Sequence, residues 1–222
     1  MKVILFGSTG MIGQGVLTEC LKDTQIESVL VVNRQSCKVT HAKLIEIIHN
    51  DFFDLSAISK QLSGYDACFY CLGVTSAGLS EADYHKNTFE LTTKVAEAVL
   101  KANKSISFCY ISGAGADSSE KGKTMWARVK GKTENTLLHM PFKSAYMFRP
   151  GYIQPLNGIQ SRTKLYRIMY AFFKPFYFIL KHYEGMVTNT AILGKALIAA
   201  VIKGSDKRIL ESRDINEIVR NN

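Results

Sequence analysis

The chain has 222 residues, of which 46% are hydrophobic and 21% are charged, and its formal net charge is +9. These values exclude a small disulfide scaffold and a wholly disordered chain, and the basic excess suits a phosphate-bearing ligand, an anionic membrane or nucleic acid. Five scattered cysteines are typical of reduced thiols, and the sequence has neither a secretory signal nor an apolar run of membrane-spanning length. We therefore expect a cytoplasmic protein without an integral membrane span.

Predicted strands and helices alternate along the first 150 residues. The strands are expected at 3–6, 29–32, 43–48, 66–72, 106–111 and 144–148, and the helices at 11–21, 81–102 and 124–139. Nearly continuous apolar strands separated by helices indicate a parallel sheet that is covered on both faces. Beyond this region we expect an aromatic-rich helical stretch, a helix at 188–202 and a last strand at 208–211.

A glycine-rich turn joins the first predicted strand to the first predicted helix. It consists of Gly7, Ser8, Thr9, Gly10, Met11, Ile12 and Gly13. Glycine permits a tight turn close to a ligand, while the helix N-terminus offers N–H groups and a partial positive charge to a pyrophosphate. A turn that binds nothing is the alternative, but the strand–turn–helix context favours a dinucleotide site. The predicted fold class is α/β, a Rossmann-type doubly wound parallel sheet with a helical C-terminal elaboration.

The residues after the second strand bear on the choice of dinucleotide. Sites that prefer NAD commonly place an acidic residue there to bind the ribose 2′-hydroxyl. This chain has Asn33 and Arg34 instead, and an arginine can pair with the 2′-phosphate of NADP, which a carboxylate would repel. A solvated surface arginine is the alternative. We predict NADP(H) as the preferred cofactor and NAD(H) as a second one.

These motifs carry a family resemblance. The glycine spacing, followed by Asn33-Arg34, Asn50-Asp51 and Cys71-Leu72-Gly73, resembles the short-chain dehydrogenase/reductase superfamily. Within it the chain is similar to the atypical branch, which includes Tat-interacting-protein-like oxidoreductases and NmrA-like proteins. The resemblance implies that Asp51 and Phe52 lie by the adenine and that Leu72 and Gly73 line the cofactor. It also places against the nicotinamide a segment made of Pro150, Gly151, Tyr152 and Ile153.

The catalytic residues of that superfamily are matched only in part. The resemblance implies a serine at the end of the fifth strand, here Ser112, and a Tyr-x-x-x-Lys pair on the next helix. In that pair the tyrosine transfers a proton, while the lysine lowers its pKa and binds the cofactor ribose. Lys130 matches the lysine, but Trp126 occupies the tyrosine position, and an indole cannot ionise near neutral pH. We therefore predict Ser112, Trp126 and Lys130 as the catalytic residues, without the usual proton donor.

Three interpretations of this replacement stay open. In the first, Trp126 forms a wall against the nicotinamide or the substrate, while Ser112 and either Tyr152 or Tyr84 transfer the proton. In the second, water or a group of the substrate supplies the proton. Alternatively, the protein binds its cofactor without turnover. The first two make it an NADP(H)-dependent oxidoreductase or an epimerase-related enzyme, and the third makes it a sensor or a protein-interaction module.

Other signals are weaker. Cys68 and Cys71 have redox-like spacing, but on a strand they point to opposite faces, so we interpret them as core residues. The five histidines lack metal-ligand spacing, which predicts no metal site. Basic residues between 121 and 132 carry no nucleic-acid recognition motif, so we interpret them as a solvated helix face and expect no nucleic-acid partner.

The stretch from 161 to 183 is rich in aromatic and basic residues. It suits a buried core, a lid over an apolar substrate or a peripheral membrane contact. Because it offers few groups for sugar hydroxyls, we expect an apolar or ring-shaped small-molecule substrate. We expect one NAD(P)-binding domain over 1–222, in which 151–222 form an elaboration on the substrate side.

Overall fold

A computed structural model of the chain describes residues 1–156, 158–159 and 185–220. The strands are β1 (Lys2–Phe6), β2 (Ser28–Asn33), β3 (Leu44–Ile48), β4 (Ala67–Tyr70), β5 (Ser107–Ile111), β6 (Ser144–Arg149), β7 (Tyr152–Gln154), β8 (Val187–Asn189) and β9 (Ile209–Glu211). The helices are α1 (Met11–Lys22), η1 (Ser56–Ile58), α2 (Glu81–His85), η2 (Lys86–Glu90), α3 (Leu91–Ala102), α4 (Met125–His139), α7 (Thr190–Ile202) and α8 (Ser212–Arg220).

A parallel sheet forms the centre of the fold. Its seven strands follow the order β3-β2-β1-β4-β5-β6-β9, and each neighbouring pair is parallel. The chain order reverses between β1 and β4. Open α/β sheets bind ligands at such a switch point, in the crevice beyond the carboxyl ends of the strands. The predicted α/β Rossmann-type doubly wound sheet is confirmed.

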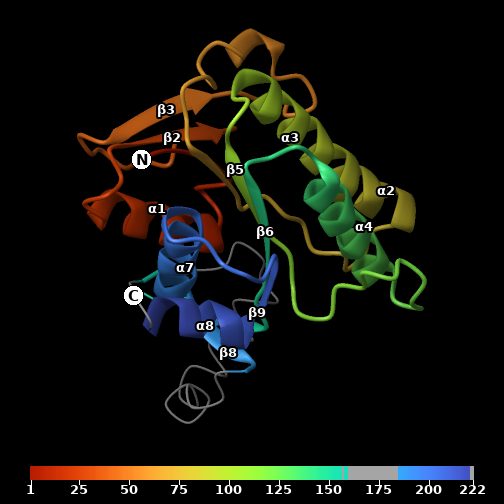
Figure 1. The fold of residues 1–222 in the computed structure, drawn as a ribbon. Helices are drawn as coiled ribbons and strands as arrows, with labels where there is room; N and C mark the ends of the chain where they lie inside the picture. The colour runs from red at the N-terminus through yellow and green to blue at the C-terminus, as the bar shows by residue number, and fades with distance from the viewer. Residues whose placement is uncertain (157, 160–184, 221–222) are drawn as a thin grey trace.

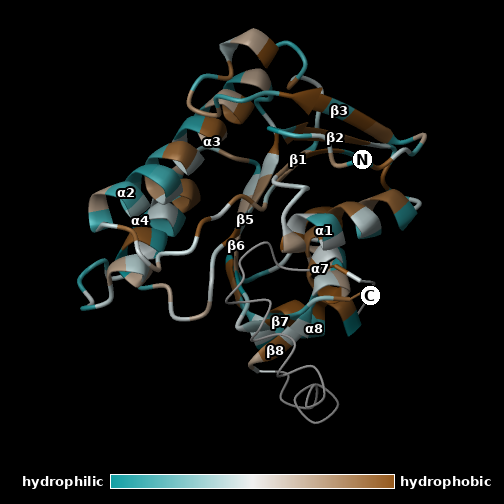
Figure 2. Ribbon diagram, turned by 180° about the vertical axis from the view of Figure 1, so that it is seen from behind, coloured by the Kyte–Doolittle hydropathy of each residue, from teal (hydrophilic) through white to brown (hydrophobic). Residues whose placement is uncertain are grey.

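Helices cover both faces of the sheet. Figure 1 shows α1, α7 and α8 on one side and α3 and α4 on the other. Because side chains alternate along a strand, Val3 and Leu5 of β1 enter the core under α1 and α7, whereas Ile4 and Phe6 enter the core under α3. In Figure 2 the strands at the N-terminal side of the sheet carry hydrophobic colours, while α2 is largely hydrophilic.

The helices α1 and α7 approach each other closely. A Cβ atom at Gly15 would lie 2.6 Å from Cβ of Thr190, and one at Gly194 would lie 3.0 Å from Cγ of Glu19. The first distance is shorter than real Cβ atoms show, and the second is tighter than most Cβ contacts, so glycine at these positions permits the close helix packing. This contact joins the C-terminal part of the chain to the same core as the first helix.

The structure corrects several predicted elements. The helix expected over 81–102 is interrupted by the π-helical turn η2, and the strand expected over 66–72 ends at Tyr70. The elements η1, β7 and β8 were not predicted, because segments of three residues show no periodicity. The helix α8 was also not predicted; it follows β9 without an intervening loop. The aromatic-rich stretch over 161–183 lies outside the described residues. Among the helices that are described, none has the length and apolarity needed to cross a membrane.

Candidate functional site

The glycine turn connects β1 to α1 at the switch point of the sheet. Gly7 has φ +85°, and a Cβ there would lie 2.8 Å from the carbonyl carbon of Cys71. At Gly13 a Cβ would lie 2.1 Å from the carbonyl oxygen of Gly7. Gly10 differs, because its added Cβ would meet only that same oxygen, at 3.4 Å. The fold thus requires glycine at Gly7 and Gly13 but has room for a side chain at Gly10.

The N-terminus of α1 faces the turn without a protein cap. Gly10 is the N-cap residue and supplies no side-chain hydrogen bond, and the first turn of the helix holds no acidic residue. The N–H groups at a helix start and its partial positive charge favour an anion. Ser8 is fully buried and donates its hydroxyl to Oδ1 of Asn33 at 2.9 Å, which ties the turn to the end of β2. Met11 and Ile12 begin the helix at this point.

A cavity of about 280 Å³ opens beside this turn at the carboxyl ends of β1, β2 and β3. It is lined by Gly7, Thr9, Val32, Asn33, Arg34, Gln35, Asn50, Phe52 and Leu72. The structure therefore brings together six of the residues that we named for cofactor binding, namely Gly7, Thr9, Asn33, Arg34, Phe52 and Leu72. Three further lining residues were not predicted to bind the cofactor, namely Val32, Gln35 and Asn50.

Arg34 and Phe52 face each other across this cavity. The guanidinium carbon of Arg34 lies 6.0 Å from the centre of the Phe52 ring, within the range of a cation–π contact. Phe52 is itself fixed by an edge-on contact with Phe6 of β1, whose ring centre is 5.9 Å away. Arg34 is exposed, so its charged group can reach a ligand.

Asp51 and Gly73 are not among the residues that line the cavity. Asp51 is exposed, and its carboxylate accepts the backbone N–H of Phe53 at 2.9 Å, so it caps its own turn. Its predecessor, Asn50, lines the cavity instead. The Asn50-Asp51 motif therefore reaches the cavity through Asn50, and the position of Asp51 by the adenine stays a prediction.

The candidate catalytic residues lie at the end of β5 and on α4. Lys130 is partly buried, and its Nζ lies 3.3 Å from the hydroxyl of Tyr110 and 3.4 Å from the carbonyl oxygen of Ile111. Burial lowers the pKa of Lys130 to about 8, although the charge of Glu134 opposes this effect. Tyr110 cannot replace the missing acid, because burial raises its pKa well above the ordinary value.

Ser112 presents an unused polar atom. Its side chain is 8% exposed, and its Oγ has no hydrogen-bond partner among the described residues. A buried hydroxyl without a partner lowers stability, so such a group calls for an explanation, and a bound ligand atom is one. Ser112 directly follows β5, and its N–H donates to the carbonyl oxygen of Phe148 at 2.7 Å. Lys130 of α4 lies close by, since its Nζ is 3.4 Å from the carbonyl oxygen of the preceding residue, Ile111.

Trp126 lies one helical turn before Lys130 on α4 and is partly buried. A Cβ at Gly115 would lie 3.5 Å from Cη2 of Trp126, so the indole packs against the loop that follows Ser112. The backbone of Gly115 has φ +87°, a conformation that favours glycine.

The segment after β6 forms part of a small parallel sheet. The N–H of Gly151 donates to Oγ of Ser212 at 2.8 Å, and β7, which contains Tyr152 and Ile153, pairs with β8. The carbonyl of Pro150 accepts the N–H of Ala114 at 3.0 Å. The segment that we predicted against the nicotinamide is therefore tied to the loop after Ser112.

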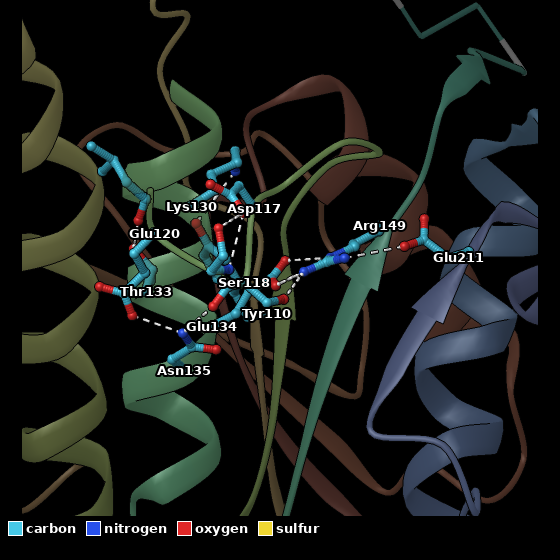
Figure 3. Close-up of polar contacts among 12 residues, drawn as sticks. Tyr110, Asp117, Ser118, Glu120, Lys130, Thr133, Glu134, Asn135, Arg149 and Glu211 are labelled. Atoms are coloured by element: carbon cyan, nitrogen blue, oxygen red, sulfur yellow. Dashed lines mark hydrogen bonds and ion pairs between the residues drawn. The ribbon is translucent and has the colours of Figure 1, made fainter. Parts of the chain in front are cut away.

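A buried ion pair supports both regions. Glu134 of α4 is fully buried, and Nε of Arg149 donates to its two carboxylate oxygens at 3.0 and 3.1 Å. Figure 3 shows Arg149 extending from β6 towards Glu134 and Ser118 on one side and Glu211 on the other. Its Nη2 also donates to Glu134 and, at 2.6 Å, to Oγ of Ser118, while Nη1 lies 3.3 Å from Oε1 of Glu211. Arg149 thus connects α4, the loop before it, β6 and β9.

The remaining signals take structural positions. Cys68 is buried in the core under α3, and Cys71 packs against the core on the other face, as predicted. We expected the basic residues between 121 and 132 to share one helix face, but they do not. The helix α4 begins only at Met125 and leaves Lys121 and Lys123 in the preceding loop. Within 1–156 and 185–220, no group of His, Cys, Asp and Glu side chains could hold a metal ion.

Comparisons with known proteins agree with this geometry. Residues 7–138 match the NAD(P)H-binding family, and the chain belongs to that family. It is 29% identical over 227 residues to protein FMP52, mitochondrial, of Chaetomium globosum, which covers 98% of this chain and 96% of that protein. It is also 26% identical over 151 residues to protein HTATIP2 of Rattus norvegicus, but this match covers 68% of the chain and only 61% of the rat protein.

Solved structures show the same fold. A short chain dehydrogenase/reductase from Saccharomyces cerevisiae superposes with a TM-score of 0.68 and 12% identity over 98% of both chains. Together with the family match, this confirms the resemblance to the atypical short-chain dehydrogenase/reductase superfamily.

The expected cytoplasmic location is wrong. Curated relatives from four fungi are named as mitochondrial proteins. Our expectation rested on scattered free cysteines, but reduced thiols do not distinguish the cytosol from other reducing compartments.

Gly10→Val tests the glycine turn as the phosphate site. We expect NADPH to bind at least about tenfold more weakly, because an isopropyl group would stand where the pyrophosphate approaches the backbone. The melting temperature should change little, since the fold leaves room at this position. Gly13→Val is the matched control and should destabilise the protein itself. Titration calorimetry that finds native affinity in Gly10→Val would refute a phosphate at this turn.

Proposed function

We propose that the protein is an NADP(H)-dependent oxidoreductase that acts on an apolar small molecule. The observation that carries this proposal is the exposed Arg34 over Phe52 in a cavity next to the uncapped N-terminus of α1. A guanidinium can pair with a 2′-phosphate, while the aromatic face suits the adenine.

The residues present fit a reduced or oxidised nicotinamide dinucleotide. Gly7, Thr9 and Gly10 would hold the pyrophosphate, Leu72 would contact the adenosine half, and Lys130 would bind the ribose near the nicotinamide. When bound, the cofactor supplies or accepts a hydride. The chain's own part is to position the substrate oxygen.

Ser112 supports turnover rather than binding alone. A buried hydroxyl without a partner in the described residues is free to hold a substrate oxygen, and the nearby Lys130 carries a lowered pKa of about 8. Shifted pKa values of this kind gather at functional sites. Trp126 would supply an apolar wall, and the described part of 151–222 would complete the substrate side.

Arg34→Ala tests the choice of cofactor. In the native protein NADPH should bind over tenfold more tightly than NADH, because a charge-assisted contact contributes about 1.5–3 kcal/mol. The substitution should remove most of that difference and leave NADH affinity nearly unchanged. Calorimetric titration with both cofactors measures the ratio.

Lys38→Ala is the control for this measurement. Lys38 is an exposed cation of the same loop, but it does not line the cavity, so its removal should leave the ratio of the two affinities unchanged. Equal affinities for NADPH and NADH in the native protein would contradict the proposal.

A further inference from the structure

Glu46 is a carboxylate in the middle of β3 that the sequence analysis did not single out. It lies opposite Val31 in the parallel pairing of β2 with β3. Its Oε1 accepts Nδ2 of Asn33 at 3.0 Å and the backbone N–H of Cys37 at 2.8 Å. Its Oε2 accepts the hydroxyl of Ser36 at 2.7 Å. One side chain therefore fastens both ends of the loop over 33–37.

The two residues inside this loop face the candidate site. Arg34 and Gln35 both line the cavity, and they lie between Asn33 and Ser36, which Glu46 holds. Asn33 also accepts the hydroxyl of Ser8 at 2.9 Å. The glycine turn, the Arg34 loop and β3 thus form one hydrogen-bonded unit.

Glu46 is charged in this setting. Burial acts to raise its pKa, but the hydrogen bonds from Cys37, Ser36 and Asn33 outweigh that effect and lower the pKa to about 2. A carboxylate near a phosphate site would ordinarily repel the ligand. Here both oxygens are engaged by three donors of the loop, which leaves them poorly placed to bind a ribose hydroxyl as the acidic residue of an NAD site does.

We propose that Glu46 is a positioning residue for cofactor selectivity, which holds the loop over 33–37 so that Arg34 faces the 2′-phosphate of NADP(H). This inference rests on the proposed function. It assigns to Glu46 a role through Arg34 and not a direct contact with the ligand. Its removal should therefore weaken NADPH binding specifically and leave the part of the site shared with NADH in place.

Glu46→Ala is the main test, with NADPH and NADH titrated separately into the full chain. We expect the ratio of the two affinities to fall about tenfold, the range of one charge-assisted contact. Glu46→Gln should retain the ratio within about threefold, because its amide oxygen can still accept from Cys37 and Asn33 while its nitrogen donates to Ser36. Should Glu46→Ala not fold, Ser36→Ala removes one attachment and should lower the ratio about threefold.

Asn103→Ala controls for a general loss of stability. Asn103 fastens a different loop, since it accepts the N–H groups of Gly64 and Tyr65 at 2.7 and 3.0 Å. This variant should lower the melting temperature without changing the affinity ratio. In an Arg34→Ala background, Glu46→Ala should change the ratio less than about twofold, because residues that act as one unit are not additive.

Three results would overturn the inference. The first is an unchanged ratio of NADPH to NADH affinity in Glu46→Ala, and the second is a fall of this ratio in Glu46→Gln as large as that in Glu46→Ala. The third is a greater loss of affinity for NADH than for NADPH in Glu46→Ala, which would make Glu46 a ribose ligand. If the native protein prefers NADPH and Glu46→Ala leaves the affinity ratio unchanged, only the role of Glu46 is refuted. Equal affinities in the native protein refute the proposed NADP(H) preference and this inference together.

Discussion

Arg149→Met should lower the free energy of unfolding by about 3–5 kcal/mol, the loss that follows when one partner of a buried ion pair is removed. Glu134 is fully buried, and Arg149 donates to both of its carboxylate oxygens. Methionine keeps much of the apolar volume but leaves that carboxylate without its cation. Denaturation by urea, followed by circular dichroism, measures the change.

Two variants make this result specific. Adding Glu134→Leu to Arg149→Met should recover most of the lost stability, because an apolar pair of similar volume can replace a buried ion pair. Arg128→Met removes an exposed pair with Glu81, whose closest distance is 2.8 Å, and should cost less than about 1 kcal/mol. A loss for Arg149→Met as small as that for Arg128→Met would show that the buried pair does not hold α4 to β6.

The strands and helices that could be predicted from sequence are those with strong local patterns. Four of the five residues of β1, Val3 to Phe6, form an apolar run that is buried, and such runs indicate a covered parallel sheet. The π-helical turn η2 could not be predicted, because its residues continue the helical pattern on both sides. The end of β4 at Tyr70 was also missed; the chain beyond it passes close to Gly7, where an added Cβ would lie 2.8 Å from the carbonyl carbon of Cys71, a contact between segments far apart in sequence.

For the candidate site, too, local patterns could be predicted from sequence, whereas contacts between distant segments could not. Glycine spacing and the position of Arg34 identified the turn and the loop, since both follow directly from the end of a strand. Phe52 and Leu72 were reached only through the family resemblance. Glu46 was missed because its role depends on the register of β3 against β2. A charged residue inside an apolar strand was the available signal.

Arg149 was missed for a related reason. It precedes Pro150, and the resemblance directed attention to the segment after it. Its partner Glu134 lies on another element, so nothing local in the sequence joins the two. Both Glu46 and Glu134 are acidic residues, and each holds in place a part of the chain next to the candidate site.

Trp126→Tyr should increase the NADPH-dependent reduction of a carbonyl probe, such as an aromatic diketone, by about 10²–10⁴-fold, the contribution of a positioned acid. The new phenol would stand four residues before Lys130, on the same face of α4 and one turn away. Below its pKa of about 8, Lys130 is an ammonium ion. A cation within a few Å favours the phenolate and so lowers the pKa of the phenol towards neutrality.

Trp126→Phe is the matched control, because it offers an aromatic ring without an ionisable group. A gain in Trp126→Tyr that is absent in Trp126→Phe would mean that the native site lacks only its proton donor. If both variants lose an activity that the native protein has, the indole is itself a working wall of the site, and the proton comes from elsewhere. If none of the three proteins reduces the probe while all bind NADPH, the result favours cofactor binding without turnover. The orphan hydroxyl of Ser112 would then mark the position of a bound ligand and not of a reacting oxygen, and the protein would act as a cofactor-binding sensor or interaction module.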